Sequence, residues 1–193
     1  MVNFIYILYY MNKETKKIIN SLIFLFIIYL ALMPSYYSLL PTIPIYDNDE
    51  VKEVKRYINN RNKEYLDYFE LTNKSVVPAF KPYVKESEDE LLKATRMIIP
   101  EIYFFKTIIN RPRPYQIDKD LNYIYTDTGL TPAMPAGHAY QAYYLSKKLS
   151  EKYPTKKDLF DKIAKKCDEC RIYAGIHYPS DGEMSKKLVN MFH

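Results

Sequence analysis

Apolar side chains recur every three or four residues along most of the chain after residue 46, which is the spacing of an amphipathic helix. The clearest stripe runs through residues 87–110, where a Ser87–Glu90 capping box predicts the helix start and Pro100 predicts a kink. The same spacing predicts further helices over residues 47–69, 138–153, 155–175 and 180–192. Because no sustained period-two segment or internal repeat is present, we expect an all-α domain, a bundle of about five to six helices.

Two further local patterns predict a loop and the start of a helix. Residues 111–137 carry several prolines and no helical stripe, which predicts a long irregular loop. Long loops in compact domains are often functional. A second capping box, from Ser180 to Glu183, predicts the start of the last helix.

The N-terminal part has a different pattern, in which a basic stretch precedes an apolar run. Lysines within residues 13–17 are followed by the apolar run 22–33, and the wider segment 18–40 is long enough to span a bilayer. We therefore divide the chain into a hydrophobic anchor or signal segment, residues 1–42, and a helical domain, residues 43–193. A basic flank before the span predicts a single membrane anchor with the domain on the non-cytoplasmic side. The alternatives are a signal peptide cleaved before secretion and a helix packed on the domain.

Charge and cysteine content narrow the choice of ligand. The net charge of +5 suits an anionic ligand or a membrane surface, and no motif indicates nucleic acid as a partner.

Cys167 and Cys170 form a CxxC pair, which can be half a zinc site or a redox motif. A zinc site needs four ligands and no second cluster is present, so we predict two thiols on one helix and no metal site.

Three cationic or titratable side chains lie on faces that are otherwise apolar. Lys106 continues the stripe Ile99–Ile102, Arg171 continues the stripe Ala164–Cys167, and His138 begins the stripe of the helix that follows it. Each one alone is explained by a side chain that reaches solvent or forms a salt bridge. The sequence offers no matching set of inward carboxylates for all three, so an external anion is the more economical partner.

The residues around these positions complete a candidate anion site. Gly137 lies at a predicted helix N-terminus, where free N–H groups favour an anion, and Arg113 follows Lys106 with the fork geometry suited to phosphate. His177 and Asp181 are separated by a turn that contains a proline. Asp181 can hold one ring nitrogen of His177 and leave the other free to attack, with His138 as the acid.

At these residues the chain resembles the superfamily of type 2 phosphatidic acid phosphatases and vanadium haloperoxidases. That family has three separated motifs, K-x6-R-P, P-S-G-H and S-R-x5-H-x3-D. Their counterparts stand here in the same order as Lys106–Arg113–Pro114, Pro135–Ala136–Gly137–His138 and Cys170–Arg171–His177–Asp181. The matches lie within residues 106–181, and of the two arginines in the RPRP stretch only Arg113 has the required lysine spacing.

The resemblance implies a helical core and metal-independent hydrolysis of a phosphate ester through a phosphohistidine. By position it implies that Lys106, Arg113 and Arg171 bind phosphate together with the Gly137 amide. It further implies that His177 is the nucleophile, that Asp181 orients it, and that His138 is the general acid and then the base. No cofactor is expected, although vanadate could occupy the phosphate site, and the substrate is expected to be a phosphorylated small molecule or a lipid phosphate.

Two positions depart from the family pattern. Ala136 occupies the phosphate-binding position where a serine usually donates, a loss of about 0.5–1.5 kcal/mol for one neutral hydrogen bond. Cys170 replaces the serine before Arg171. The alternatives to a phosphatase are a non-catalytic phosphate-binding or membrane-associated structural protein and a vanadate-dependent haloperoxidase.

Overall fold

The computed structural model describes residues 49–193 together with Thr15, Ile18, Ser21, Leu22 and Leu25. The chain divides into two units, residues 1–34 and 35–193, and the second contains every element considered below. The predicted anchor at residues 18–40 and the predicted boundary at residue 42 lie largely outside the described residues. Among the residues that are described, none belongs to a helix both long and apolar enough to cross a membrane.

The all-α class is confirmed, because residues 49–193 contain helices and connecting segments but no strand. Helices of ten or more residues in this part of the chain are α3 (Glu50–Asn59), α4 (Lys63–Thr72), α6 (Glu88–Met97), α7 (Ile99–Ile109), α9 (Gly137–Lys152), α10 (Lys157–Tyr173) and α11 (Pro179–Phe192). Shorter helical turns are α5 (Val77–Phe80), η1 (Lys81–Tyr83), α8 (Pro114–Ile117), η2 (Asp127–Leu130) and η3 (Pro154–Lys156).

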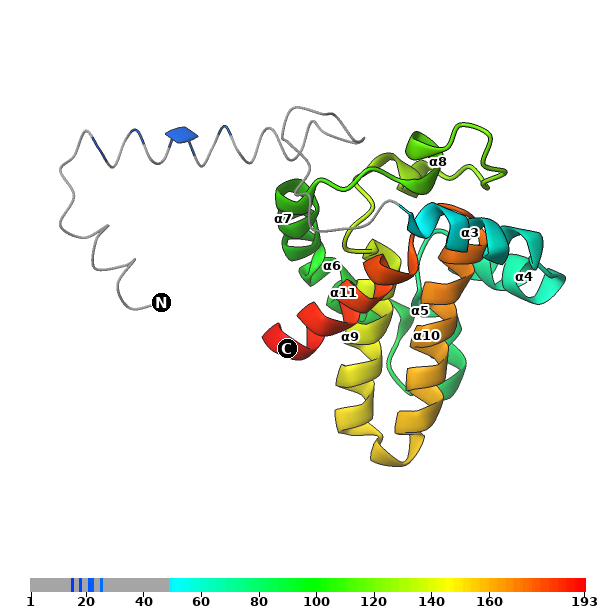
Figure 1. Ribbon diagram of the computed structural model, residues 1–193. Helices are drawn as coiled ribbons and strands as arrows, with labels where there is room; N and C mark the ends of the chain where they lie inside the picture. The colour runs from blue at the N-terminus through cyan, green and yellow to red at the C-terminus, as the bar shows by residue number, and fades with distance from the viewer. Residues whose placement is uncertain (1–14, 16–17, 19–20, 23–24, 26–48) are drawn as a thin grey trace. The chain divides into compact units, whose positions relative to one another are not determined.

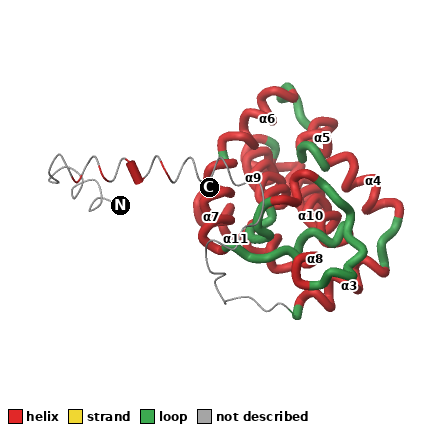
Figure 2. The backbone as a smooth tube through the Cα atoms, turned by 90° about the horizontal axis from the view of Figure 1, so that it is seen from above, coloured by secondary structure: helices red, strands yellow, loops and turns green. Residues whose placement is uncertain are grey.

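Helices α9 and α10 form the centre of the domain and lie side by side (Figure 1). Helices α3 and α4 pack on α10, whereas α6, α7 and α11 pack on α9, so that the central pair is surrounded (Figure 2). The largest apolar cluster joins α5, α6, α9 and α10 and includes Phe80, Leu145 and Phe160. Because α9 and α10 run in opposite directions, the start of α9 lies beside the end of α10.

The predicted capping box and kink account for the local structure of α6 and α7. Ser87 Oγ accepts from the N–H of Glu90, and the Glu90 carboxylate accepts from the N–H of Ser87 at 2.7 Å. Helix α6 ends at Met97, and Pro100 lies in the first turn of α7, where its missing N–H costs nothing. The predicted single kinked helix is therefore two helices.

The start of the last helix differs from the prediction. Helix α11 begins at Pro179, so Ser180 is inside its first turn rather than at the cap. The Asp181 carboxylate accepts from the N–H of Tyr178 at 2.9 Å and takes the place assigned to Glu183. Proline at the first helical position fixes φ in advance, which explains the earlier start.

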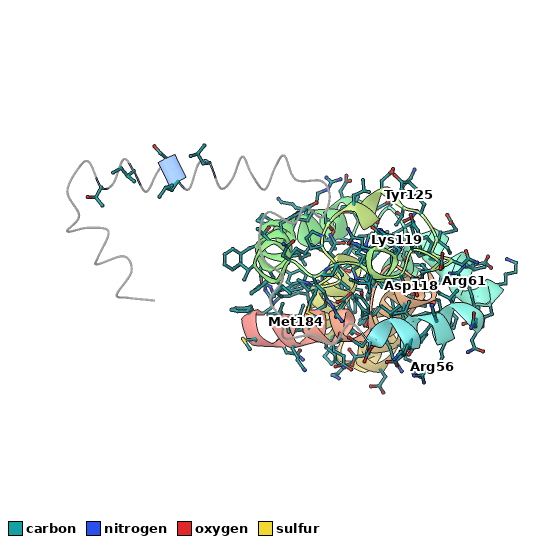
Figure 3. The ribbon with its side chains drawn as sticks, turned by 45° about the horizontal axis from the view of Figure 1, so that its top comes forward. Arg56, Arg61, Asp118, Lys119, Tyr125 and Met184 are labelled. Atoms are coloured by element: carbon teal, nitrogen blue, oxygen red, sulfur yellow. The ribbon has the colours of Figure 1, made fainter. Side chains whose placement is uncertain are left out.

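The segment between α7 and α9 is the predicted long loop, interrupted only by the short turns α8 and η2. Contacts from α3 and the turn after it fasten this loop to the bundle (Figure 3). Lys55 Nζ lies 2.5 Å from Asp118 Oδ2, and Arg61 donates to the carbonyls of Asn122 and Tyr173, each at 2.8 Å.

Helices α10 and α11 approach closely at Gly182. A methyl group added to its Cα would lie 2.0 Å from Asp168 Oδ2, a distance that no packed pair of atoms adopts. Asp168 is itself buried, and its Oδ2 accepts from Tyr143 Oη at 3.1 Å. The absence of a side chain at residue 182 is therefore what allows this carboxylate to lie between the two helices.

We expect Gly182→Ala to destabilise the domain by about 1–3 kcal/mol, because the gain in helix propensity is smaller than the cost of overpacking. The free energy of unfolding in urea measures this change. Gly137→Ala is the matched control, since a methyl group there meets no atom nearer than 3.7 Å. Equal stability of the two variants would contradict the steric argument.

The buried Asp168 should also make stability depend on pH. Burial, as the largest cause, raises the pKa of Asp168 to about 7, and the nearby Asp181 adds to this shift. The folded protein then holds a proton that the unfolded chain releases near pH 4, so the free energy of unfolding falls as pH rises from about 4 to about 7. Asp168→Asn removes this dependence and should be more stable than the wild type at pH 8, by up to roughly 4 kcal/mol. Urea unfolding of both proteins at pH 5 and pH 8 tests this, and a constant difference between them would contradict it.

Candidate functional site

The three sequence motifs meet at one end of the central helix pair, the end at which α3 and α8 also lie (Figure 1). The first motif contacts the third through Arg113 Nη1, which lies 3.1 Å from His177 Nε2. The second contacts the third through the N–H of Ala136, which donates to the carbonyl of Asp181 at 3.2 Å. Lys106 at the end of α7 lies against Gly137 at the start of α9, since a methyl group on Gly137 would be 3.7 Å from Lys106 Cε.

His177 and Asp181 form a buried hydrogen-bonded pair. His177 Nδ1 lies 3.0 Å from Asp181 Oδ2, and the two residues expose 3% and 0% of their surface. The other ring nitrogen, Nε2, faces the guanidinium of Arg113, which can only donate. The network therefore assigns the ring proton to Nδ1 and leaves a lone pair on Nε2.

The field around His177 keeps its ring neutral. Burial, followed by the positive charges of Arg113, Lys106 and Arg171, holds the pKa of His177 well below its usual range. Burial, the largest cause, raises the pKa of Asp181, and the charge of Arg111 and the N–H of Tyr178 oppose this shift. A neutral imidazole with an unprotonated nitrogen is the form that can act as a nucleophile.

Arg113 is buried and held mainly by main-chain oxygens. Its Nε donates to the carbonyl of Thr131 at 2.7 Å, and its Nη1 donates to the carbonyl of Ile176 at 2.8 Å. Burial lowers the pKa of Arg113 to about 10, which leaves the guanidinium charged at neutral pH. Arg113 therefore places a positive charge beside His177, and no carboxylate among residues 49–193 forms a salt bridge with it.

Lys106 and Gly137 lie on the neighbouring side of the site. Lys106 exposes 4% of its surface, and its ammonium donates to the carbonyl of Pro132. Burial, followed by the charge of Arg113, holds the pKa of Lys106 well below its usual range. The N–H of Gly137 is in the first turn of α9, where helix geometry provides no acceptor for it.

The main chain of Ala136 makes two hydrogen bonds to α11. Its N–H donates to the carbonyl of Asp181, and its own carbonyl accepts from Ser185 Oγ at 3.0 Å. Both main-chain groups therefore join the second motif to α11. The methyl side chain cannot donate, and the placement of Ala136 at the phosphate site stays a prediction.

Arg171 is fully buried with part of its guanidinium unpaired. Its Nη2 donates to the carbonyl of Thr72 at 2.5 Å and to Thr72 Oγ1 at 2.9 Å, while the ring of Phe69 lies 4.4 Å below. Among the described residues, its Nε and Nη1 have no hydrogen-bond partner. Buried donors of a charged group are rarely left unpaired, so these two atoms are available to donate to water or to an anion.

His138 is held by the residue that follows Thr72. Its Nε2 lies 3.1 Å from the carbonyl of Asn73, so Nε2 carries the proton and Nδ1 is the basic nitrogen. Burial, followed by the charge of Arg171, holds the pKa of His138 well below its usual range. Two consecutive carbonyls at the end of α4 thus fix two site residues that come from different helices.

Sequence reasoning missed several residues of this arrangement. Arg111, the first arginine of the RPRP stretch, donates to Asp181 Oδ1 at 2.8 Å and to Glu50 Oε2 at 2.6 Å. Arg111 belongs to the same RPRP stretch as Arg113, and in the sequence only the spacing from Lys106 distinguishes the two arginines. Thr72 and Asn73 contribute mainly through carbonyl oxygens, which every residue type has and which therefore leave no signal in a sequence.

The remaining sequence predictions concern the CxxC pair and a metal site. Cys167 and Cys170 are free, buried thiols on α10, and burial raises the pKa of both, which makes them poor nucleophiles. Within the described part of the chain, no group of three or more histidine, cysteine or acidic residues is placed to hold a metal ion.

Comparison with known proteins adds no assignment. No protein-family model matches the chain, and none of the curated proteins matches it significantly.

The unpaired donors of Arg171 predict an effect of inorganic phosphate on stability. A ligand at 100 times its dissociation constant adds about 2.7 kcal/mol, so the melting temperature of the wild type should rise with phosphate concentration. Arg171→Gln should lose most of this rise when compared with its own phosphate-free value. Arg61→Gln, which also removes an arginine that donates to carbonyls, should keep it. An undiminished rise in Arg171→Gln would contradict anion binding at this residue.

Proposed function

We propose that this protein is a phosphoric monoester hydrolase of the phosphatidic acid phosphatase type, which acts without a metal ion through a phosphohistidine. One observation carries the proposal. Lys106, Arg113 and Arg171 are buried around a histidine–aspartate pair, and no carboxylate among residues 49–193 lies within 4 Å of their charged nitrogens. Buried cations need a negative partner, and a phosphoryl group supplies one.

The balance of charge favours a monoester as the substrate. Arg111 is already paired with Glu50 and Asp181. The positive charge in excess in the described site is therefore that of the other three cations, Lys106, Arg113 and Arg171. A phosphomonoester is a dianion near neutral pH, whereas a diester has one charge. The dianion compensates more of the surplus, and it would raise the depressed pKa of Lys106 and so keep that ammonium charged.

In the first step, His177 Nε2 attacks phosphorus and the bond to the leaving oxygen breaks. The Asp181 carboxylate stabilises the positive charge that develops on the ring, because it accepts the Nδ1 proton. Arg113 Nη1, which already donates toward Nε2, is placed to donate to a phosphoryl oxygen that arrives there. The leaving oxygen takes a proton from His138.

His138 must gain a proton before it can act as the acid. The charges of Arg171 and Lys106 lower its pKa, and a bound dianion would oppose them and raise it. In the second step, water attacks the phosphohistidine, His138 Nδ1 takes the proton from that water, and inorganic phosphate leaves. Each group then returns to its starting protonation state.

The proposal extends to the setting of the enzyme. A lipid phosphate would suit an enzyme held at a membrane by residues 18–40, with its domain on the non-cytoplasmic side. The support for this part is the apolar run alone, and a soluble phosphorylated substrate fits the same charge balance.

We expect His177→Ala to reduce phosphate release by at least about 10³-fold, because the nucleophile is lost. The assay uses a chromogenic monoester with a chelator present and the full chain in detergent. His193→Ala is the matched control, since His193 contacts Glu101 at 3.0 Å outside the site and its removal should leave turnover unchanged. Rapid acid-free quenching with a radiolabelled substrate should detect phosphate attached to the wild type but not to His177→Ala.

Three other results would contradict the mechanism or support a different function. Equal turnover in the wild type and His177→Ala would contradict the mechanism. Phosphate binding without turnover on monoester, diphosphate or lipid phosphate would support the non-catalytic alternative. Halide oxidation with vanadate and peroxide would support the haloperoxidase alternative.

A further inference from the structure

Arg111 is a buried arginine that the proposed chemistry does not use. It exposes 1% of its surface, although it lies in the loop that follows α7. Its Nη1 donates to Asp181 Oδ1 at 2.8 Å and to Ser180 Oγ at 2.6 Å, and its Nη2 donates to Glu50 Oε2 at 2.6 Å. The guanidinium also lies flat against the ring of Tyr178, 3.8 Å from its centre.

These contacts determine which oxygen of Asp181 faces the histidine. Oδ1 is occupied by Arg111, and Oδ2 accepts from both His177 Nδ1 and the N–H of Tyr178. Rotation of the carboxylate would break all three bonds at once. Arg111 therefore restricts Asp181 to the single orientation in which Oδ2 meets the ring of His177.

Arg111 is in turn oriented by the first residue of α3. Glu50 Oε2 accepts from Arg111 Nη2 and from Ser180 Oγ, the latter at 2.5 Å, and Glu50 Oε1 accepts from the N–H of Ser180 at 3.2 Å. The side chain of Glu50 remains 22% exposed. Helix α3, which is far from the three motifs in the sequence, is thereby linked to His177 and Asp181 through Arg111.

We propose that Arg111 is a positioning residue for the His177–Asp181 pair and that Glu50 and Ser180 set its orientation. This inference rests on the proposed function for its kinetic consequence, but the arrangement itself can be tested without turnover. Loss of Arg111 frees Oδ1 and loosens the carboxylate, so the hydrogen bond from His177 Nδ1 to Oδ2 weakens, while Arg113 still faces Nε2.

Arg111 also has an electrostatic effect on the pair. Its positive charge lowers the pKa of His177 and opposes the raised pKa of Asp181. Removal of that charge should therefore raise both values and extend the protonated, inactive form to higher pH. Among the described residues, the other titratable or charged groups that act on the pair are Lys106 of α7, Arg113, His138 of α9, Arg171 and Asp168 of α10, and Tyr178. Glu50 of α3 acts on Arg111.

The first test uses the low histidine content of the chain. With three histidines in all, the ring nitrogens of ¹⁵N-histidine-labelled protein can be assigned by single substitutions at His138 and His193. At pH 7 the wild type should show His177 with a protonated Nδ1 and an unprotonated Nε2. Arg111→Gln should shift the Nδ1 signals of His177, because the hydrogen bond from Nδ1 to Asp181 weakens, whereas Arg61→Gln should leave them unchanged. Unchanged His177 signals in Arg111→Gln would overturn the inference, whether or not the wild type is an enzyme.

The second test is kinetic. Arg111→Gln should lower kcat by roughly 10–100-fold, the usual effect of removing a group that orients a catalytic ligand. It should also move the acid limb of kcat/KM to higher pH, because burial and the neighbouring positive charges, Arg111 among them, lower the pKa of His177. Arg111→Lys, which keeps the charge but not the fork, should restore the pH profile more than kcat. Arg61→Gln should lower stability without moving the profile, and an unmoved profile in Arg111→Gln would overturn the inference.

A third variant keeps the test decisive if Arg111→Gln does not fold. Glu50→Gln changes a partly exposed side chain and leaves Arg111 in place without its second carboxylate. It should shift the His177 signals and lower kcat in the same direction as Arg111→Gln, by a smaller factor. Wild-type signals and rates in Glu50→Gln would remove Glu50 from the proposal. A wild type without any turnover would refute the phosphatase assignment and leave the nitrogen signals to decide the role of Arg111.

Discussion

The carboxylate of Asp181 is the contact on which the site depends, because it joins segments that are far apart in the chain. It lies at the start of α11, accepts from His177 on the preceding turn and receives Arg111 from the loop after α7. The carbonyl of the same residue receives the N–H of Ala136 at the start of α9. Among the described residues, removal of this carboxylate would leave Arg111 buried with Glu50 as its remaining acidic partner, which is a costly state.

Around this anion the domain buries more positive than negative charge. Lys106, Arg113 and Arg171 are satisfied only in part, and by neutral oxygens or a histidine ring. A protein gains nothing in stability from such an arrangement, because each buried cation carries a desolvation cost. Burial of apolar side chains in the clusters between α9, α10 and their neighbours offsets this cost. Such a surplus is more readily explained by ligand binding than by stability.

Much of this arrangement could be predicted from the sequence, and the limits have physical causes. The contact between His177 and Asp181 follows from their separation of four residues at a helix start, and the burial of Lys106 and Arg171 follows from their place on apolar stripes. The partner of Arg111 could not be predicted, because Glu50 is one of many acidic residues and is distant in the sequence. Ser180 has the residue type of a helix cap, but Pro179 fixes the backbone first and releases the hydroxyl to contact Glu50.

The end of α4 carries a consequence for mutational analysis. The carbonyls of Thr72 and Asn73 hold the guanidinium of Arg171 and the ring of His138, one after the other along the backbone. Neither oxygen belongs to a side chain, so alanine scanning would leave both in place and would report only side-chain contacts, such as the bond that Thr72 Oγ1 accepts from Arg171 Nη2 at 2.9 Å. An amide-to-ester replacement, or a change in the length of α4, would instead expose their contribution. In this fold, the tolerance of a position to substitution is therefore a poor measure of its importance to the site.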